Sequence, residues 1–416
     1  MVSVSKGSFA KPTGGAPATQ SINVGFQMTA GTSVLWLWCT KQTAEGSANQ
    51  GFYAFGVSDG TTHSCIADAS MDGVASSQAA RNQRNVKILS ILANGNDVTA
   101  PSDECTVSYT ATGFDLTWNP NTANAYLIHY LAVAGLDNVE VGNFTMPIVT
   151  GNQTITLAGA FQPNFVMIFS ARRLTSDNTL SSVPGAMNIS AFTGSGKDFA
   201  LSVASEDGRL TMDTWKWQRQ NSVCTKLTPT TGAVDARAIF VSINSNGWTH
   251  DWTDASGAAD IVYYVAIKGG QWAADEFTKT LTAATVTQDI TTVGFQPKAY
   301  MLLSLLNAVN NGAIANSDSN ICIGATDGTA EGSAAMTDED DVADSDTYNN
   351  YNTTKAITMT NATNGSVNSE ADHSAFLSNG FRLSWTTNDT NNAWYIFYIA
   401  VGDAVVGAGR NRGHVM

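Results

Sequence analysis

A histidine beside a carboxylate occurs in the segment GWTHDWTDASGAAD, where His250 precedes Asp251 and is followed by Asp254 and Asp260. Such a couple can transfer protons as a general acid and base. If GWTHDW is a strand, however, His250 and Asp251 point to opposite faces, because successive side chains alternate along a strand. We therefore expect an incidental polar pair here and no catalytic couple.

A run of carboxylates occupies the segment TDEDDVADSD. Its members are Asp338, Glu339, Asp340, Asp341, Asp344 and Asp346. Oxygen-rich loops of this kind can hold calcium. The spacing lacks the D-x-[DN]-x-[DN]-G order of a helix–loop–helix calcium site. We therefore expect a solvated acidic loop and predict no metal.

Two tryptophans, Trp215 and Trp217, alternate with Lys216 in the segment DTWKWQRQ. On a strand their rings share one face, where they could stack on the sugars of a host-surface glycan or against a partner protein. Burial in the core of their own domain is the alternative, because aromatic rings supply much of a core's apolar area. The sequence leaves both readings open.

The elements that position these residues recur with a period of about 134 residues. Three sets of aromatic residues mark the repeat: Phe26, Phe161 and Phe295; Trp118, Trp252 and Trp385; and Tyr130, Tyr264 and Tyr398. Within each set, neighbouring members are 133 to 135 residues apart. A unit of this length can fold alone. We predict three domains, at residues 1–140, 141–274 and 275–416, the last with a C-terminal tail, joined by the linkers LDNVEVGNF and GGQWAADEF.

Each unit is written in short apolar runs separated by Gly, Asn, Asp, Ser and Thr. Examples are SVLWLWCT, FVMIFSA and the hairpin GFRLSWTTNDTNNAWYIFYIAVGD. This pattern predicts an all-β protein of three antiparallel β-sandwich units, similar to jelly rolls, with eight to ten strands each. The closing strand YIFYIAV is apolar on both faces, which indicates that a neighbouring unit or subunit covers its outer face.

The repeat also tests for catalysis. The residues that recur at matched positions are Gly, Phe, Trp, Ile, Tyr, Ala and Gln, and no acid, base or nucleophile recurs in all three copies. The recurring set is therefore a packing set. We predict a protein that is not an enzyme, with no catalytic residue and no cofactor.

The bulk composition narrows the partners. The chain has 416 residues, 21 Lys and Arg against 35 Asp and Glu, and a net charge of −14. Nucleic acid is not an expected partner, because binding it requires clustered positive charge. No segment reads as a signal peptide or a membrane span, so no membrane partner is expected either. The five cysteines show no C-x-x-C pair and are expected to be free and buried.

Three segments of the third copy carry a resemblance: GFQPKAY from Gly294, GFRLSW from Gly380 and YIAVG from Tyr398. The sequence resembles tandem-repeat β-rich virion proteins of tailed bacteriophages. The first copy departs from the pattern with GFQMTA, and the second with AFQPNF. The resemblance implies a structural protein of the virion, made in the host cytoplasm, whose partners are other capsid or tail proteins.

Within that class we expect a capsid decoration protein, because three units in one chain can imitate a trimer at a three-fold position. The protein would be an oligomer or a pseudo-symmetric assembly. A receptor-binding protein of the tail or baseplate is one alternative, and a lectin-like carbohydrate-binding protein is another. The basic tail that contains Arg410 and Arg412 is expected to anchor to an acidic neighbour.

Overall fold

The computed structural model describes residues 1–93, 101–181, 183–194, 196–309, 312–314 and 317–404. Within these ranges the chain forms strands and no helix, and the strands pair antiparallel. The all-β prediction is confirmed. The described part of the chain contains no helix that is long and apolar enough to span a membrane. The basic tail with Arg410 and Arg412 lies outside the described residues.

The first third of the chain, repeat 1 below, contains eleven strands. They are β1 (Ser3–Ala10), β2 (Ala18–Asn23), β3 (Ser33–Cys39), β4 (Gly46–Asn49), β5 (Gly51–Ser58), β6 (His63–Ser70), β7 (Ala79–Arg84), β8 (Leu89–Ile91), β9 (Asp103–Thr110), β10 (Gly113–Trp118) and β11 (Leu127–Ala134).

The second third, repeat 2, contains the next eleven. They are β12 (Asn138–Thr145), β13 (Gly151–Thr156), β14 (Phe165–Arg173), β15 (Asn178–Ser181), β16 (Gly185–Gly194), β17 (Lys197–Ser205), β18 (Thr214–Gln220), β19 (Cys224–Leu227), β20 (Val234–Asn244), β21 (Gly247–Asp254) and β22 (Ile261–Lys268).

The last third, repeat 3, contains the remaining described strands. They are β23 (Gln271–Thr278), β24 (Val286–Ile290), β25 (Ala299–Ser304), β26 (Gly312–Ile314), β27 (Ser319–Thr326), β28 (Glu331–Asp338), β29 (Thr347–Asn352), β30 (Ile357–Thr360), β31 (Val367–Leu377), β32 (Gly380–Thr387) and β33 (Tyr395–Gly402).

The two expected linkers are strands, so that prediction is wrong. LDNVEVGNF forms most of β12, and GGQWAADEF forms most of β23. Each strand pairs along its whole length with the closing strand of its own repeat, β22 or β33, as β1 does with β11. The boundaries drawn after residues 140 and 274 therefore cut through β12 and β23. Alternate burial along β12, with polar residues and a glycine between its buried positions, hid this edge strand in the sequence.

The strands form three seven-stranded and three four-stranded sheets with a recurring order. The seven-stranded sheets run β1-β11-β3-β5-β6-β7-β15, β12-β22-β14-β16-β17-β18-β26 and β23-β33-β25-β27-β28-β29-β4. The four-stranded sheets run β2-β10-β9-β8, β13-β21-β20-β19 and β24-β32-β31-β30. Consecutive strands such as β5, β6 and β7 are neighbours, so this order differs from the interleaved strands of the expected jelly roll.

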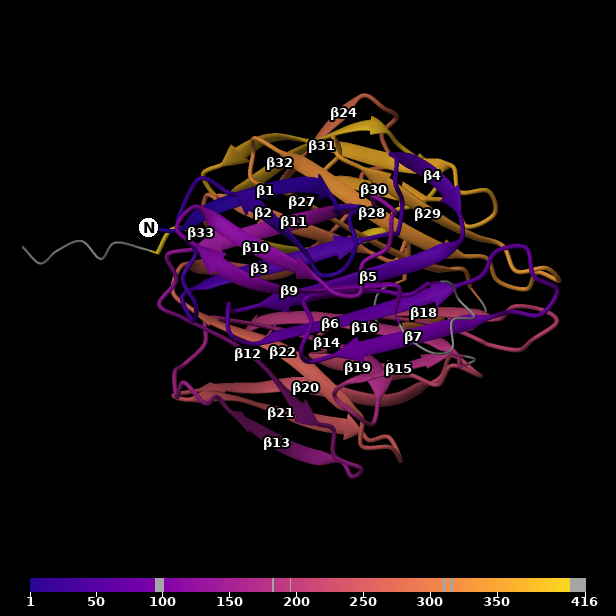
Figure 1. Ribbon diagram of the computed structural model, residues 1–416, viewed down its shortest axis with the longest axis horizontal. Coiled ribbons are helices and arrows are strands. Elements are labelled where there is room, and N and C mark those ends of the chain that lie inside the picture. Colours follow the sequence, from indigo (N-terminus) through magenta and orange to yellow (C-terminus); the bar gives the residue numbers. More distant parts are fainter. Residues whose placement is uncertain (94–100, 182, 195, 310–311, 315–316, 405–416) are drawn as a thin grey trace, which may run out of the picture.

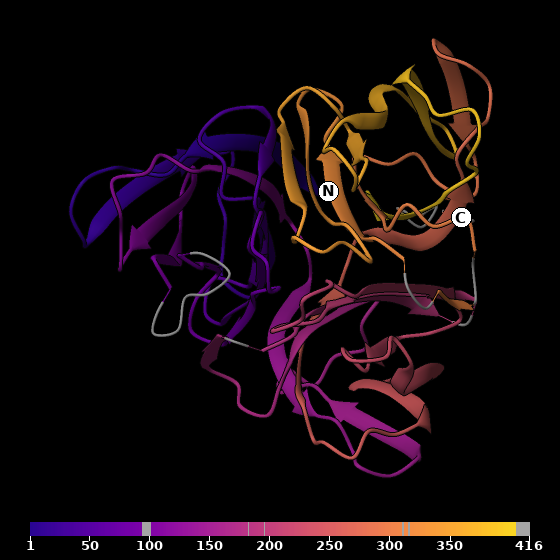
Figure 2. The same cartoon turned by 90° about the vertical axis from the view of Figure 1, so that its right-hand side faces the viewer.

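One strand in each seven-stranded sheet comes from a different repeat. Repeat 1 gives β4 to the sheet of repeat 3, repeat 2 gives β15 to repeat 1, and repeat 3 gives β26 to repeat 2. The three donations close a ring, because every repeat gives one strand and receives one. Figure 2 shows the three repeats as lobes around a common centre.

Apolar side chains form two kinds of core. Each four-stranded sheet packs on the seven-stranded sheet of its repeat, around Trp118, Trp252 or Trp385. A further cluster joins all three repeats at the centre and includes Trp38 and Phe169. In Figure 1 the four-stranded sheets, for example β13-β21-β20, lie on the outside of the molecule. The inner faces of the seven-stranded sheets therefore provide the contacts that hold the ring together.

The closing strand β33 is covered on both faces, as its sequence indicates. Ile396 and Tyr398 belong to the core of repeat 3, whereas Phe397 and Ile399 belong to the central cluster. The Phe397 ring lies 4.9 Å from that of Phe199 in repeat 2, measured between centroids. Burying a side chain of this size contributes about 1.5–3 kcal/mol. A strand between two cores must be apolar at every position.

The start of the chain meets its end. The backbone N–H of Val2 donates to Asp403 Oδ1 at 2.7 Å. Lys298 Nζ donates to the carbonyl of Val2 at 2.7 Å and forms an ion pair with Asp403 at 2.9 Å. At the other two joints, repeats are connected covalently, through residues 135–137 and 269–270. These polar contacts take the place of a peptide connection at the third joint.

Candidate functional site

The three exchanged segments all leave their sheets through a residue with left-handed backbone conformation. These residues are Lys41, Arg172 and Leu306, with φ of 56°, 56° and 50°. The strand registers place them at equivalent positions, seven residues after Val34, Phe165 and Ala299. A residue other than glycine pays about 1–2 kcal/mol for this conformation. Its occurrence in all three repeats indicates that redirecting the chain to its neighbour outweighs that cost.

Side-chain amides from the receiving strands stabilise the seams between repeats. Gln83 Oε1 on β7 accepts from the N–H of Ala171 at 2.9 Å, and its Nε2 donates to the carbonyl of Ile261 at 3.0 Å. Gln218 Nε2, at the equivalent position of β18, donates to the carbonyl of Asn307 at 3.0 Å. These buried amides satisfy backbone groups that the exchange leaves without a ladder partner.

The seam between repeats 1 and 3 buries a cluster of basic and aromatic groups. His129 stacks on Tyr351, with ring centroids 4.0 Å apart, and its Nε2 donates to the carbonyl of Ser333 at 3.1 Å. Lys6 Nζ lies 3.4 Å from His129 Nδ1. Burial lowers the pKa of Lys6 to about 7 and holds that of His129 well below its ordinary value. The stack needs a neutral imidazole, because Nδ1 must accept a proton from its neighbours.

The acidic run is not the solvated loop that its sequence predicts. Asp338 is fully buried, and burial raises the pKa of its carboxyl to about 7. Ser70 Oγ of repeat 1 donates to Asp338 Oδ2 at 2.9 Å. Asp340 Oδ1 accepts from the N–H of Thr214 in repeat 2 at 2.7 Å. The run thus connects all three repeats, and no group of three metal-binding side chains exists among the described residues.

His250 and Asp251 lie on opposite faces of β21, as predicted. His250 is 1% exposed, accepts from Trp248 Nε1 at 3.1 Å and donates from Nε2 to Gln153 Oε1 at 3.2 Å. Burial lowers the pKa of His250 to about 4. Asp251 is half-buried on the other face. The imidazole is therefore a neutral member of the core, and the two residues cannot act as a proton-transfer couple.

Trp215 and Trp217 are each 2% exposed. Both belong to a small cluster with Ala200 and Leu227, between β17, β18 and β19. Trp217 also stands opposite Ala313 of the donated strand β26. Burial leaves neither ring a surface on which a sugar could stack. The observation that favoured glycan contact at these residues is therefore lost.

The nine aromatic markers of the repeat lie at equivalent places in the three cores. The Trp residues are 0% exposed, the Tyr residues between 0% and 7%, Phe161 is buried, and Phe26 and Phe295 are half-buried. The sequence contained a further recurrent residue that the analysis missed. Gln20, Gln153 and Gln288, 133 and 135 residues apart, each donate from Nε2 to a backbone carbonyl, and the last two accept from the Trp indole.

The pentapeptide GVSDG at residues 56–60 fits the G-x-S-x-G pattern, so Ser58 requires separate attention. A nucleophile elbow exposes its serine between a strand and a helix. Ser58 instead ends β5 in a hairpin, is 0% exposed, and bonds to His63 Nδ1 at 2.8 Å and to the N–H of Gly60 at 2.9 Å. Thr326 caps the equivalent turn of repeat 3. Ser58 is therefore a turn residue.

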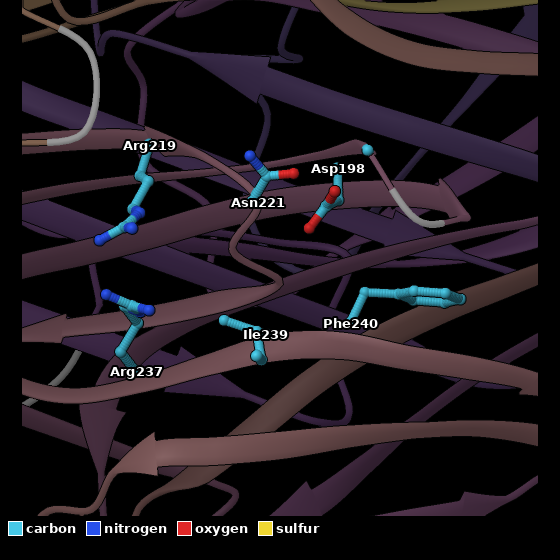
Figure 3. Close-up of a pocket in the computed structure, with 7 residues that line it drawn as sticks. Asp198, Arg219, Asn221, Arg237, Ile239 and Phe240 are labelled. Atoms are coloured by element: carbon cyan, nitrogen blue, oxygen red, sulfur yellow. The ribbon is translucent and has the colours of Figure 1, made fainter.

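A surface pocket of about 340 Å³ lies between β17, β18 and β20 of repeat 2. Figure 3 shows the guanidinium groups of Arg219 and Arg237 directed toward each other, with Asp198 and Asn221 on the upper rim. Burial and the neighbouring Arg219 lower the pKa of Arg237, and burial raises that of Asp198 to about 6. The two guanidinium groups present paired N–H donors of the kind that bind a carboxylate.

This double-arginine pocket is private to repeat 2. The strand registers match Arg219 and Arg237 to Arg84 and Glu104 of repeat 1, whose side chains form an ion pair at 3.0 Å. In repeat 3 the two positions hold Asn352 and Glu370. Replacement of the acid by arginine in repeat 2 turns an internal ion pair into a site with two positive charges.

All five cysteines are free and buried, as expected from their spacing. Burial raises the pKa of each thiol, for example that of Cys39 to about 12, so thiolate chemistry is suppressed. Comparisons of the sequence with protein-family models and with curated proteins give no match.

Proposed function

We propose that the chain consists of three tandem antiparallel β-sandwich modules, one for each repeat, and that it is a non-enzymatic structural protein of a bacteriophage particle. Its proposed position is on the capsid shell, as a decoration protein. The observation that carries this proposal is the closed ring of strand exchange, in which each repeat donates one strand and receives one. A single chain thereby has the shape of a cyclic trimer.

The ring supports a three-fold location for a geometric reason. A closed cyclic assembly presents the same surface three times around one axis. Three equivalent shell subunits around a three-fold position can each take one copy of that surface. Because the three copies are linked in one chain, the second and third contacts form at high effective concentration, and avidity exceeds the affinity of one contact.

The chemistry of the repeats agrees with a packing role. The aromatic residues that recur with the period lie in cores. The histidine beside a carboxylate that the sequence offered, His250, is neutral and buried. A protein that stabilises a shell needs a rigid body with three similar faces, and the exchanged strands and the central core supply that rigidity.

The proposal is tested on particles purified from the host that encodes this chain. Mass spectrometry of the particles should detect the protein, and electron microscopy should show one three-lobed density at three-fold positions of the shell. Absence of the protein from purified particles would overturn the virion assignment. Presence with density only at the tail or baseplate would keep the virion assignment and replace the capsid position by the attachment alternative.

A further inference from the structure

A second cavity, of about 460 Å³, lies at the seam between repeats 1 and 2 and gathers basic side chains in an acidic protein. Arg81 reaches it from β7 of repeat 1. Arg172 and Arg173 at the end of β14, and Lys226 on β19, reach it from repeat 2. We call these four residues the seam cluster. They include four of the 21 lysines and arginines of the chain.

The seam cluster carries more positive charge than its surroundings neutralise. Lys226 Nζ lies 2.7 Å from Asp260 and 3.2 Å from Asp235, and Arg172 lies 3.3 Å from Asp235. These two carboxylates face four cations. Asp68, the cross-strand neighbour of Arg81, adds little negative charge, because burial and Asp338 raise its pKa well above the ordinary value. About two positive charges therefore remain without a counter-charge.

Arg173 is the member with the least compensation. It is 7% exposed, and its guanidinium makes no hydrogen bond to any described residue. The Nε atoms of Arg81 and Arg172 are likewise buried without a partner. Burial lowers the pKa of Arg81 to about 10, and the charges of Arg172 and Arg173 lower it further. A buried cation without a partner costs several kcal/mol, and arginine cannot escape that cost by losing its proton.

The other two seams provide an internal comparison. The registers match the positions of Arg172, Arg173, Arg81 and Lys226 to one residue set at each of them. Between repeats 1 and 3 the set is Lys41, Gln42, Asn349 and Ile91; between repeats 2 and 3 it is Leu306, Asn307, Lys216 and Met359. Each of these sets contains one basic residue. Strand exchange alone therefore does not require the seam cluster.

We propose that the seam cluster binds a small tetrahedral oxyanion, phosphate or sulfate, which connects repeat 1 to repeat 2. Guanidinium groups offer paired, coplanar N–H donors that match the oxygen spacing of such anions. Arg81 and Arg173 come from different repeats, so an anion between them neutralises both and holds the seam. This inference does not depend on the proposed location of the protein in a virion.

The test measures inorganic phosphate binding to the full-length protein by isothermal titration calorimetry, at constant ionic strength maintained with sodium chloride. We expect saturable binding at one site with a dissociation constant of about 1 mM or tighter. Phosphate and sulfate should also raise the melting temperature above that in chloride. Absence of binding up to about 10 mM phosphate would overturn the proposal.

Variants identify the site. Arg173→Met should weaken phosphate binding at least about tenfold, because it removes a charge-assisted donor pair. In a low-salt buffer without phosphate or sulfate, the same change should raise the melting temperature, since it removes an uncompensated buried charge. A purely structural arginine would give the opposite sign. Arg81→Met tests the other wall of the cavity, and Arg382→Met, which removes an exposed ion pair with Asp289, is the control. Phosphate binding that survives both Arg173→Met and Arg81→Met would reject the seam cluster as the site.

Discussion

The ion pair between Lys11 and Asp103 permits a test of repeat 1 against repeat 2. Lys11 Nζ lies 2.9 Å from Asp103 Oδ1, and both side chains are fully buried. Lys11 also donates to Asn121 Oδ1 at 2.5 Å and to the carbonyl of Thr122 at 2.8 Å. The registers match Lys11 and Asp103 to Met146 and Ala236 of repeat 2. The same fold therefore contains an apolar solution for these two positions.

We expect Lys11→Met to lower the free energy of unfolding by about 3 kcal/mol. Breaking a buried pair by removal of one partner costs about 3–5 kcal/mol, because the remaining charge is stranded. The lower end applies because Asp103 keeps hydrogen bonds from the backbone N–H of Thr122 at 2.5 Å and from Ser102 Oγ at 2.8 Å. The double variant Lys11→Met/Asp103→Ala, which installs the pair of repeat 2, should cost only about 1–2 kcal/mol.

The assay is urea unfolding followed by tryptophan fluorescence, with hydrogen exchange to locate the loss of protection. Protection should fall around Lys11 and Asp103 and stay unchanged around Lys279, the matching lysine of repeat 3. The control is Lys197→Met, which removes a half-exposed ion pair with Asp275 and should cost less than about 1 kcal/mol. A double variant at least as unstable as Lys11→Met would refute the argument that the stranded charge carries the cost.

Three further predictions concern buried or repelling charges. Asp338→Asn should remove part of the pH dependence of stability: the raised pKa of about 7 makes the wild-type protein lose up to about 1.4 kcal/mol per pH unit between pH 4 and 7, and parallel unfolding curves for both proteins would contradict this. Lys6→Met should stabilise the protein most at pH 7 and below. Its advantage should shrink toward pH 9, because the unfolded chain binds a proton in that range that the folded Lys6, with a pKa of about 7, has released; urea midpoints at each pH measure it, and an advantage independent of pH would refute the burial argument. Arg237→Glu should restore in repeat 2 the ion pair of repeat 1 and raise the free energy of unfolding by about 0.5–1 kcal/mol, as measured by urea unfolding, whereas a loss of stability would show that Arg219 and Arg237 do not repel each other in the folded protein.

Local patterns in the sequence were sufficient for the elements and for their recurrence. The all-β character, the doubly covered strand at Tyr395–Gly402 and the separation of His250 from Asp251 follow from two-residue alternation and from the length of each apolar run. The edge strand Asn138–Thr145 was taken for a linker, because a half-exposed strand with polar residues and a glycine lacks a continuous apolar signal. The glutamines at positions 20, 153 and 288 were readable from their spacing but were overlooked.

The candidate sites depend on contacts between distant segments. The seam cluster joins Arg81 to residues about 90 and 145 positions later, and nothing local to either segment indicates that they meet. Asp338 reads as part of a solvated acidic loop until Ser70 of repeat 1 is seen to donate to it. Trp215 and Trp217 could equally lie in a core or on a surface until β19 and β26 cover them. Burial and charge compensation depend on which surfaces meet.

The sequence by itself determined that this protein is built from strands, three times over with one period, because strand alternation and turn residues act over a few residues and a copied unit keeps its spacing. Only the tertiary structure decided that the repeats exchange strands in a closed ring. The donated segment Gly46–Asn49 is short and exposed along its length, so its own residues carry no strong preference for a partner. Its place is fixed by the free ladder of the neighbouring sheet and by the left-handed residue that directs the chain toward it.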